Sequence, residues 1–264
     1  MSWIDSHCHL YPFYKMGKID EILMRASSAS VNQMITVGTT YDDWIVYREL
    51  VKQHPVTLNY SVGLHPCYVT KNWRQQTEHI LKFWQKVPRP CALGEIGLDY
   101  FHLPSDFQKS SEIISLQKHC LLFQLKIAKE LDCPVIIHSR DAFFDCIELI
   151  EESGVDWEKV VFHCFSEGEA EMEQLLKLGG TASFTGIITY KNNEKIISSI
   201  KLLGEENVML ETDSPYLPPE PFRKSQNEPS MIPVIGKKVS EILDVSEDLL
   251  AQNSKSKTSK FFNL

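Results

Sequence analysis

Histidines and carboxylates stand at the ends of several short apolar segments of this 264-residue sequence. His7 and His9 are two residues apart in a segment that predicts a strand, so their side chains share one face. Neutral imidazole and carboxylate groups are the usual ligands of catalytic divalent metals. Gathered in one place, they would be costly unless something bound them. The candidate metal ligands are His7, His9, Glu95, His138, His163 and Asp213.

The segments that carry these residues alternate with stretches of helical periodicity. The predicted strands are Trp3–Cys8, Gln33–Val37, Val56–Val62, Cys91–Ile96, Pro134–His138, Lys159–His163, Thr181–Phe184 and Asn207–Glu211. The predicted helices are Ile19–Ser28, Tyr41–Gln53, Arg74–Lys86, Asp106–Leu131, Ala142–Glu152, Glu169–Leu178, Glu194–Leu202 and Met231–Leu243. Eight strand–helix units predict an α/β fold, a (β/α)₈ barrel of the TIM type, whose active face is the C-terminal end of the strands.

A doubly wound open sheet is the alternative architecture. Such a sheet usually carries a glycine-rich phosphate loop after its first strand, and no glycine stands there in this chain. We find no linker or composition break, so we expect a single domain over residues 1–264. The segment from Ser254 to Lys260 is basic and serine-rich and could be a disordered tail, but the Phe261–Phe262 pair favours an end that docks on the body.

Net charge, hydropathy and cysteine spacing argue against several classes of protein. The formal net charge of −8 argues against a protein that grips nucleic acid by bulk electrostatics. No stretch is long and apolar enough for a membrane span, and we see no secretory signal. The seven scattered cysteines include no C-x-x-C pair, which is typical of reduced thiols in a cytoplasmic protein. Cys8 and Cys164 are expected to face the helices as packing residues.

Six candidate ligands exceed what one catalytic metal needs, because such a metal usually keeps three protein ligands and an open position. Two cations that share a bridging carboxylate fit better. We expect Glu95 to bridge, with His7, His9 and Asp213 on one cation and His138 and His163 on the other. The imidazole-rich set suits zinc, manganese or iron, whereas magnesium normally prefers more oxygen; the ion itself stays open.

Further polar residues are expected around this site. Glu211 lies two residues before Asp213 and could orient a ligating histidine, and Asp5 could act in the same way. Four residues are candidates for substrate contacts, each with a structural alternative as a rim or salt-bridge residue. They are His65, Tyr100, Arg140 and Lys191.

The chain resembles the TatD-type metal-dependent deoxyribonucleases of the amidohydrolase-like barrel superfamily, and the matching motifs run in order along nearly its whole length. They are Asp5-Ser6-His7-Cys8-His9, Gly63-Leu64-His65-Pro66, Gly94-Glu95-Ile96-Gly97-Leu98-Asp99-Tyr100, Ile137-His138-Ser139-Arg140-Asp141-Ala142, His163-Cys164-Phe165-Ser166, Glu211-Thr212-Asp213-Ser214-Pro215-Tyr216-Leu217 and Asn227-Glu228-Pro229.

This resemblance implies a (β/α)₈ barrel and metal-dependent hydrolysis of DNA, often as an exonuclease, for which we expect 3'-5' polarity on single-stranded or frayed ends. It implies the same six metal ligands. Two positions depart from the family pattern: Glu167 replaces a glycine, which could reshape the loop beside His163, and Lys257 replaces an asparagine near the C-terminus.

The mechanism expected from these residues is attack by a metal-activated water, with Asp213 orienting or deprotonating it and both cations neutralising the phosphoryl oxygens. Two cations would halve the formal net charge of −8 and concentrate positive charge in the mouth. The rival is an amide or ester hydrolase, including one that deacylates mis-charged tRNA. A third hypothesis is a binding protein that has lost catalysis. Such a protein would lack some of the metal-ligating residues, and none of the six is missing. We expect no membrane or obligate protein partner.

Overall fold

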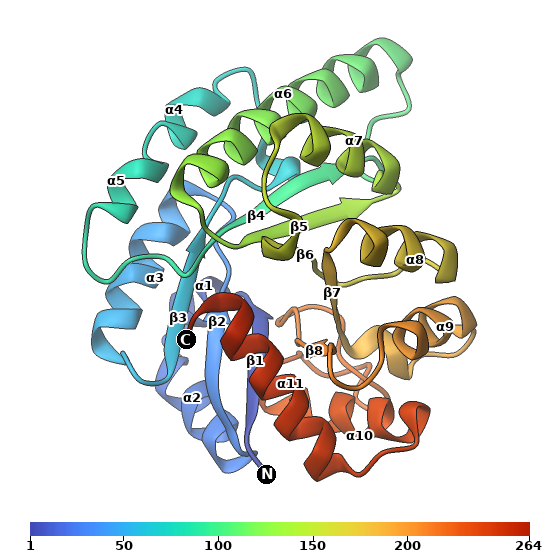
Figure 1. Cartoon of the computed structure of the whole chain (residues 1–264). Coiled ribbons are helices and arrows are strands. Elements are labelled where there is room, and N and C mark those ends of the chain that lie inside the picture. Colours follow the sequence, from blue (N-terminus) through green and yellow to red (C-terminus); the bar gives the residue numbers. More distant parts are fainter.

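Eight parallel strands follow one another around a barrel in sequence order, in a computed structural model that describes residues 1–264 (Figure 1). The strands are β1 Trp3–Cys8, β2 Val31–Thr36, β3 Leu58–Val62, β4 Ala92–Asp99, β5 Val135–Arg140, β6 Val160–Phe162, β7 Thr181–Phe184 and β8 Met209–Leu210. The segment that follows the last strand returns to the first through a bridge between Ser214 and Cys8. The predicted (β/α)₈ barrel is confirmed.

Helices surround the strands on the outside of the barrel (Figure 1). They are α1 Tyr11–Lys15, α2 Ile19–Ser28, α3 Tyr41–Gln53, α4 Trp73–Thr77, α5 Ile80–Trp84, α6 Phe107–Leu131, α7 Phe143–Ser153, α8 Glu169–Leu178, α9 Glu194–Leu203, α10 Ile232–Leu243 and α11 Glu247–Phe262. The single helix predicted over Arg74–Lys86 is wrong, because the segment forms two short helices. The Thr77 hydroxyl donates back to the carbonyl of Trp73, a bond that competes with regular helix continuation.

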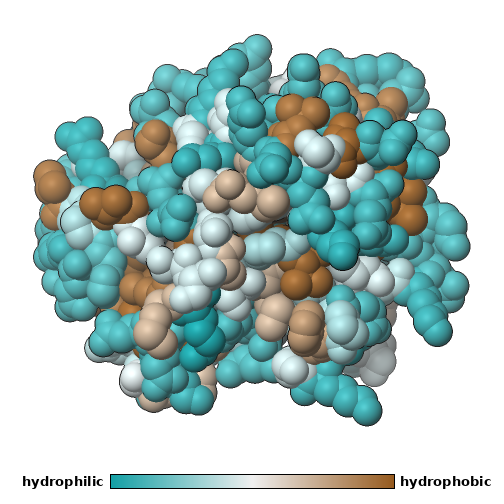
Figure 2. Space-filling model, turned by 90° about the horizontal axis from the view of Figure 1, so that it is seen from below, coloured by the Kyte–Doolittle hydropathy of each residue, from teal (hydrophilic) through white to brown (hydrophobic).

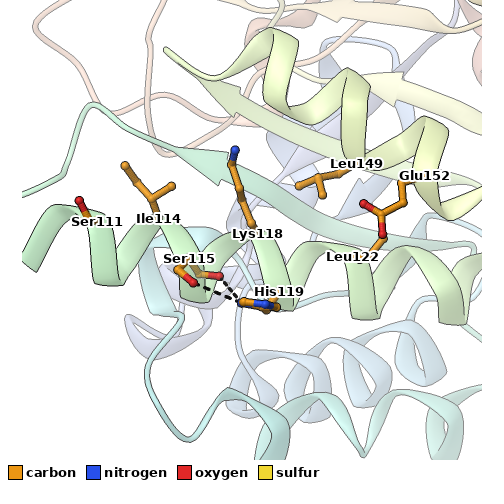
Figure 3. Close-up of a pocket in the computed structure, with 8 residues that line it drawn as sticks. All are labelled: Ser111, Ile114, Ser115, Lys118, His119, Leu122, Leu149 and Glu152. Carbon is orange, nitrogen blue, oxygen red and sulfur yellow. Dashed lines mark hydrogen bonds between the residues drawn. The ribbon is translucent and has the colours of Figure 1, made fainter.

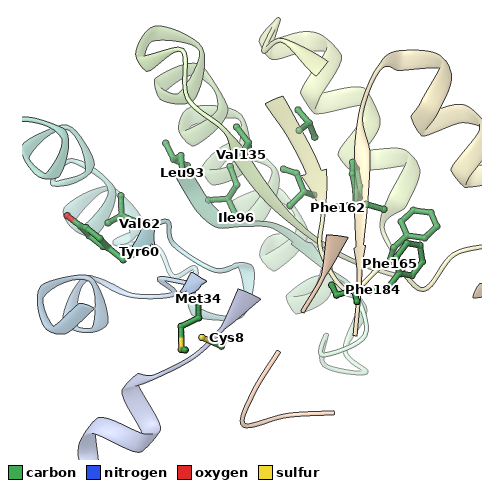
Figure 4. Close-up of a cluster of buried hydrophobic side chains, with 14 of the residues drawn as sticks. Cys8, Met34, Tyr60, Val62, Leu93, Ile96, Val135, Phe162, Phe165 and Phe184 are labelled. Carbon is green, nitrogen blue, oxygen red and sulfur yellow. The ribbon is translucent and has the colours of Figure 1, made fainter. Parts of the chain in front are cut away.

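Two apolar clusters hold the barrel together. The larger one lies mainly between the strands and the outer helices, where Cys8 and Met34 pack side by side in Figure 4. The smaller one combines strand residues with the end of α11 and includes Ile136, Val161 and Phe262. Phe262 is buried, so the C-terminal segment docks on the body as one of the two sequence interpretations predicted.

The apolar and polar residues of the strands form successive layers. Ile136 precedes His138 by two residues and Val161 precedes His163 by two, so each histidine continues the face of a buried aliphatic residue. The small cluster therefore lies under the polar end of the strands and supports it.

The outer surface is mostly polar. Figure 2 shows one face on which hydrophilic side chains dominate and hydrophobic ones form small separate patches. None of the helices has the length and apolar character needed to cross a membrane. All seven cysteines are free thiols.

Gly97 allows strands β4 and β5 to approach each other beside the expected metal ligands Glu95 and His138. It pairs with His138, and its φ is +152°. A Cβ at this position would overlap the carbonyl oxygen of His138. Only glycine fits this close backbone approach.

We predict that Gly97→Ala lowers the free energy of unfolding by more than about 2 kcal/mol, because β4 must move away from β5. Gly17→Ala is the matched control, since Gly17 also has a positive φ but open space around it; it should cost about 1 kcal/mol. Urea unfolding of both variants measures the difference. Equal losses would show that the close approach is unimportant.

Candidate metal centre

A cavity of about 780 Å³ opens where the strands end. Five of the six expected metal ligands line it, namely His9, Glu95, His138, His163 and Asp213. His7 lies fully buried among them, with its Nε2 atom 3.2 Å from that of His9. The structure thus brings all six residues together, from both ends of the chain.

Glu95 occupies the middle of this group. Its Oε1 atom lies 2.7 Å from Nδ1 of His138 and 2.7 Å from Nε2 of His163. Its Oε2 atom lies 3.4 Å from Nε2 of His7 and 3.7 Å from Nε2 of His9. The two carboxylate oxygens therefore face different pairs of histidines, which is the arrangement that a bridging carboxylate requires.

Asp213 joins the histidine pair of β1. Its Oδ1 atom is 3.2 Å from Nε2 of His9 and 3.6 Å from Nε2 of His7. The backbone of Asp213 follows β8 and donates its N–H to the carbonyl of His7 at 2.9 Å, and its φ is +53°. This left-handed conformation and the bond to β1 place the carboxylate over the barrel rather than along the strand.

Asp5 has a different task from the expected one of orienting a ligating imidazole. Its carboxylate accepts hydrogen bonds from the backbone N–H and the hydroxyl of Thr212, at 2.9 and 2.6 Å. It also accepts the backbone N–H of His7 at 3.2 Å. Asp5 therefore ties the backbone before Asp213 to β1, and the interpretation of Asp5 as a partner of an imidazole is wrong.

Glu211 lies where the sequence places it, below His163. Its Oε1 atom is 3.4 Å from Nδ1 of His163 and accepts the backbone N–H of Cys164 at 2.6 Å. Its Oε2 atom accepts the Ser183 hydroxyl at 2.6 Å. Its orienting role stays a prediction. Cys164 lines the cavity instead of facing the helices, because its backbone is left-handed, with φ of +46°, and strand alternation ends after His163.

The chemistry of the donor set fits divalent cations. Nδ1 of His138 lies 3.2 Å from Nε2 of His163, as close as the two Nε2 atoms of His7 and His9. Each pair can share one proton in an N–H···N hydrogen bond, and 3.2 Å is also close to the separation of two nitrogen ligands on one cation, about 3.3 Å for metal–nitrogen bonds of about 2.0–2.1 Å. Nδ1 of His7 is moreover buried without a hydrogen-bond partner.

The electrostatics of the centre keep Glu95 ionised. Burial by itself would raise the pKa of this carboxyl, but the neighbouring histidines outweigh it and hold the pKa well below its usual range. The Glu95 carboxylate is therefore available as an anionic ligand at neutral pH.

The expected substrate residues divide into two groups. His65 and Arg140 line the cavity, with His65 Nε2 only 3.3 Å from Glu95 Oε1, so it approaches the metal donors. Tyr100 and Lys191 lie outside the cavity lining. The Tyr100 hydroxyl donates to Asp145 at 2.6 Å, and Lys191 is exposed in the loop after β7. The structure therefore gives these two residues no contact with the cavity.

Sequence reasoning overlooked two aromatic residues of the cavity. Tyr68 and Tyr216 line it and are 50% and 56% exposed, so their rings are free to contact a ligand. Tyr68 follows the His65-Pro66 motif closely and Tyr216 lies three residues after Asp213. Their proximity to those motifs was the available signal.

A second depression lies between α6 and α7, away from the barrel mouth (Figure 3). Its histidine, His119, bonds back to Ser115 of its own helix instead of facing other polar groups across the depression. It offers no converging set of ligands, so the barrel mouth is the candidate site.

Comparison with known proteins agrees with this geometry. The family described as TatD related DNase matches residues 4–263. This chain belongs to the TatD family. It is similar to YcfH of Escherichia coli strain K12, named as an uncharacterized metal-dependent hydrolase, with 31% identity over all of this chain and 97% of that protein. Membership of the TatD family makes it a metal-dependent hydrolase.

Two further TatD relatives are informative. A Rahnella protein named "3'-5' ssDNA/RNA exonuclease TatD" is 29% identical over 83% of this chain and 82% of its own length. The crystal structure of YjjV, a TatD homologue from E. coli K12, superposes with a TM-score of 0.89 at 29% identity, covering 99% of this chain and 98% of that one. The barrel and the family are therefore shared along the whole chain.

We predict that Glu95→Gln lowers the metal content of the purified protein by at least half, because an anionic side chain that faces both histidine pairs is lost. Added metal should then no longer raise the melting temperature, since stabilisation by a ligand scales with its affinity. The exposed Glu173→Gln is the control. Metal analysis and thermal unfolding with and without chelator test this, and unchanged metal content would contradict the bridging role.

Proposed function

We propose that this TatD-family chain hydrolyses phosphodiester bonds of DNA at a two-metal site and removes nucleotides from the 3' end. The observation that carries the proposal is the position of Glu95, whose two oxygens face separate histidine pairs. The family description and the name of the Rahnella relative support the substrate class.

In this proposal each histidine pair holds one cation. His7, His9 and Asp213 would hold the first, His138 and His163 the second, and Glu95 would contact both. Bound cations of this kind lower the pKa of a water molecule and neutralise charge on phosphoryl oxygens. The imidazole-rich donors favour zinc, manganese or iron.

Asp213 is the group best placed to orient the attacking water and accept its proton. Its carboxylate reaches the cavity and lies beside His9. Burial would raise the pKa of Asp213, but the hydrogen bond with His9 and the charge of His7 outweigh burial and lower it. The carboxylate is therefore ionised and able to act as a base.

The remaining cavity residues suit a nucleic acid strand. The Arg140 guanidinium lies 4.0 Å from the ring centroid of Phe101, which holds a cation at the rim for a phosphate. The exposed rings of Tyr68 and Tyr216 offer surfaces on which bases can stack. With few basic groups in the lining, binding should depend on salt less than in a basic groove.

The cavity lining contains no lysine, so a carboxylated lysine, which bridges the metals of some amide hydrolases on this barrel, has no counterpart among the lining residues. The assay that separates the substrates uses DNA oligonucleotides labelled at either end, a short amide panel and an aminoacyl-tRNA. We expect chelator-sensitive loss of the 3' label first. Turnover of only the amides or the tRNA would replace the nuclease proposal.

We predict that Asp213→Asn lowers the rate of DNA cleavage by at least about 100-fold, because an amide cannot accept the proton. The amide oxygen can still bind metal, so metal content is measured alongside. Asp244→Asn is the control, since Asp244 is an exposed cap of α10 in the left-handed conformation that asparagine tolerates. Wild-type cleavage by Asp213→Asn would refute its role as base.

We predict that Arg140→Ala raises KM for single-stranded DNA at least about tenfold while kcat changes little, since one charged phosphate contact is worth roughly 1.5–3 kcal/mol. Arg89→Ala removes an exposed arginine before β4 and should leave KM unchanged. Steady-state kinetics at one fixed salt concentration compare the two. An unaltered KM in Arg140→Ala would exclude the phosphate contact.

A further inference from the structure

A second group of metal-ligating atoms lies in the same cavity, beside the six-residue centre. It consists of Cys67 in the turn after β3, Asp99 at the end of β4 and His102 in the loop that follows. Cys67 Sγ is 3.5 Å from Asp99 Oδ2 and 3.8 Å from His102 Nδ1. His102 Nδ1 is 2.9 Å from Asp99 Oδ2.

These spacings match a tetrahedral zinc site. Zn–S bonds of about 2.3 Å and Zn–N or Zn–O bonds of about 2.0–2.2 Å put sulfur roughly 3.5 Å from the other donors, and nitrogen roughly 3.3 Å from oxygen. The three atoms need to move by only a few tenths of an ångström to ligate one ion. Three protein ligands would leave a fourth position open.

The Asp99 carboxylate is crowded in a way that a cation would relieve. Its Oδ2 atom lies within 3.0 Å of His138 Nε2 and also faces both Cys67 and His102. Three groups thus converge on one oxygen, which has two lone pairs. Binding a cation would replace two of these hydrogen bonds, with the Cys67 proton released to solvent.

This group is separate from the centre around Glu95. His138 stands between them, with Nδ1 turned to Glu95 at 2.7 Å and Nε2 to Asp99 at 3.0 Å. Asp99 is buried, whereas Cys67 and His102 are exposed at the cavity wall, so an ion can enter from solvent.

We propose that Cys67, Asp99 and His102 bind a third divalent cation of the zinc class. A thiolate ligand selects Zn²⁺ or Co²⁺ over Mg²⁺, Ca²⁺ and Mn²⁺. Because all three residues line the cavity, an open position on that side would attract an anionic group of the substrate. The site does not depend on which bond the enzyme cleaves.

The test uses the full chain, stripped of metal by chelation and titrated with Co²⁺. A cobalt–thiolate bond gives a charge-transfer absorption in the near ultraviolet, which imidazole and carboxylate ligands do not give. We expect three equivalents of Co²⁺ to bind, one of them with this absorption. Binding of two equivalents without the absorption would overturn the proposal.

Variants assign the absorption to its ligand. Cys67→Ser should lose the band and one of the three equivalents, and His102→Gln should lose the same equivalent. Cys164→Ser is the matched control, because Cys164 lines the same cavity but its Sγ lies 3.4 Å from the Thr185 hydroxyl. A band that survives in Cys67→Ser or disappears in Cys164→Ser would refute the site.

The Glu95→Gln variant distinguishes failure of this third site from failure of the proposed two-metal function. It should lower the other two equivalents and leave the thiolate band in place. Disappearance of the band in Glu95→Gln would show that no independent third site exists, whether or not DNA is the substrate.

Discussion

The buried carboxylate of Glu95 is the constraint on which the rest of this structure depends. Glu95 is only 2% exposed, and an isolated carboxylate so far from water would be very unfavourable. It is held ionised by histidine nitrogens from β1, β5 and the end of β6. The barrel brings these distant segments within reach of one side chain, so the candidate metal centre depends on the barrel.

The base of the barrel protects this arrangement. Aliphatic residues two positions before His138 and His163 form an apolar layer, and Phe262 from the C-terminal helix α11 packs with them. The polar centre is thereby separated from solvent on that side and open at the cavity on the other. Strongly bound cations need such a rigid and partly desolvated surrounding, because ligands that move apart lose affinity.

The wall of the cavity and its floor come from different parts of the fold. The floor consists of strand residues fixed by backbone pairing, whereas Tyr68, Arg140 and Tyr216 stand at strand ends or in the loops that follow. Loops can change without altering the barrel, which is how barrel enzymes vary their substrates. The cluster of Cys67, Asp99 and His102 lies at this boundary, with one ligand on a strand and two in loops.

The sequence by itself determined the barrel and the identity of the residues that gather at its mouth. Alternation along a strand has a period of two, so His7 and His9 had to share a face. The family motifs also occur in order along nearly the whole chain, which supported the same residues as metal ligands. These inferences hold because they depend on local backbone geometry, which a few neighbouring residues specify.

Only the tertiary structure decided where the two-residue alternation of side chains along a strand is interrupted. Ala92 packs in the apolar layer and Glu95 in the candidate metal centre. The two residues are three positions apart, a spacing that puts side chains on opposite faces of a regular strand, and an irregular register between Leu93 and Ile96 lets them share one face. The Tyr100 hydroxyl bonds to Asp145, and the Asp5 carboxylate accepts the backbone N–H of Thr212. Cys67 lies beside Asp99 and His102. Contacts of this kind depend on how separate loops and strands pack in three dimensions, and no local spacing encodes them.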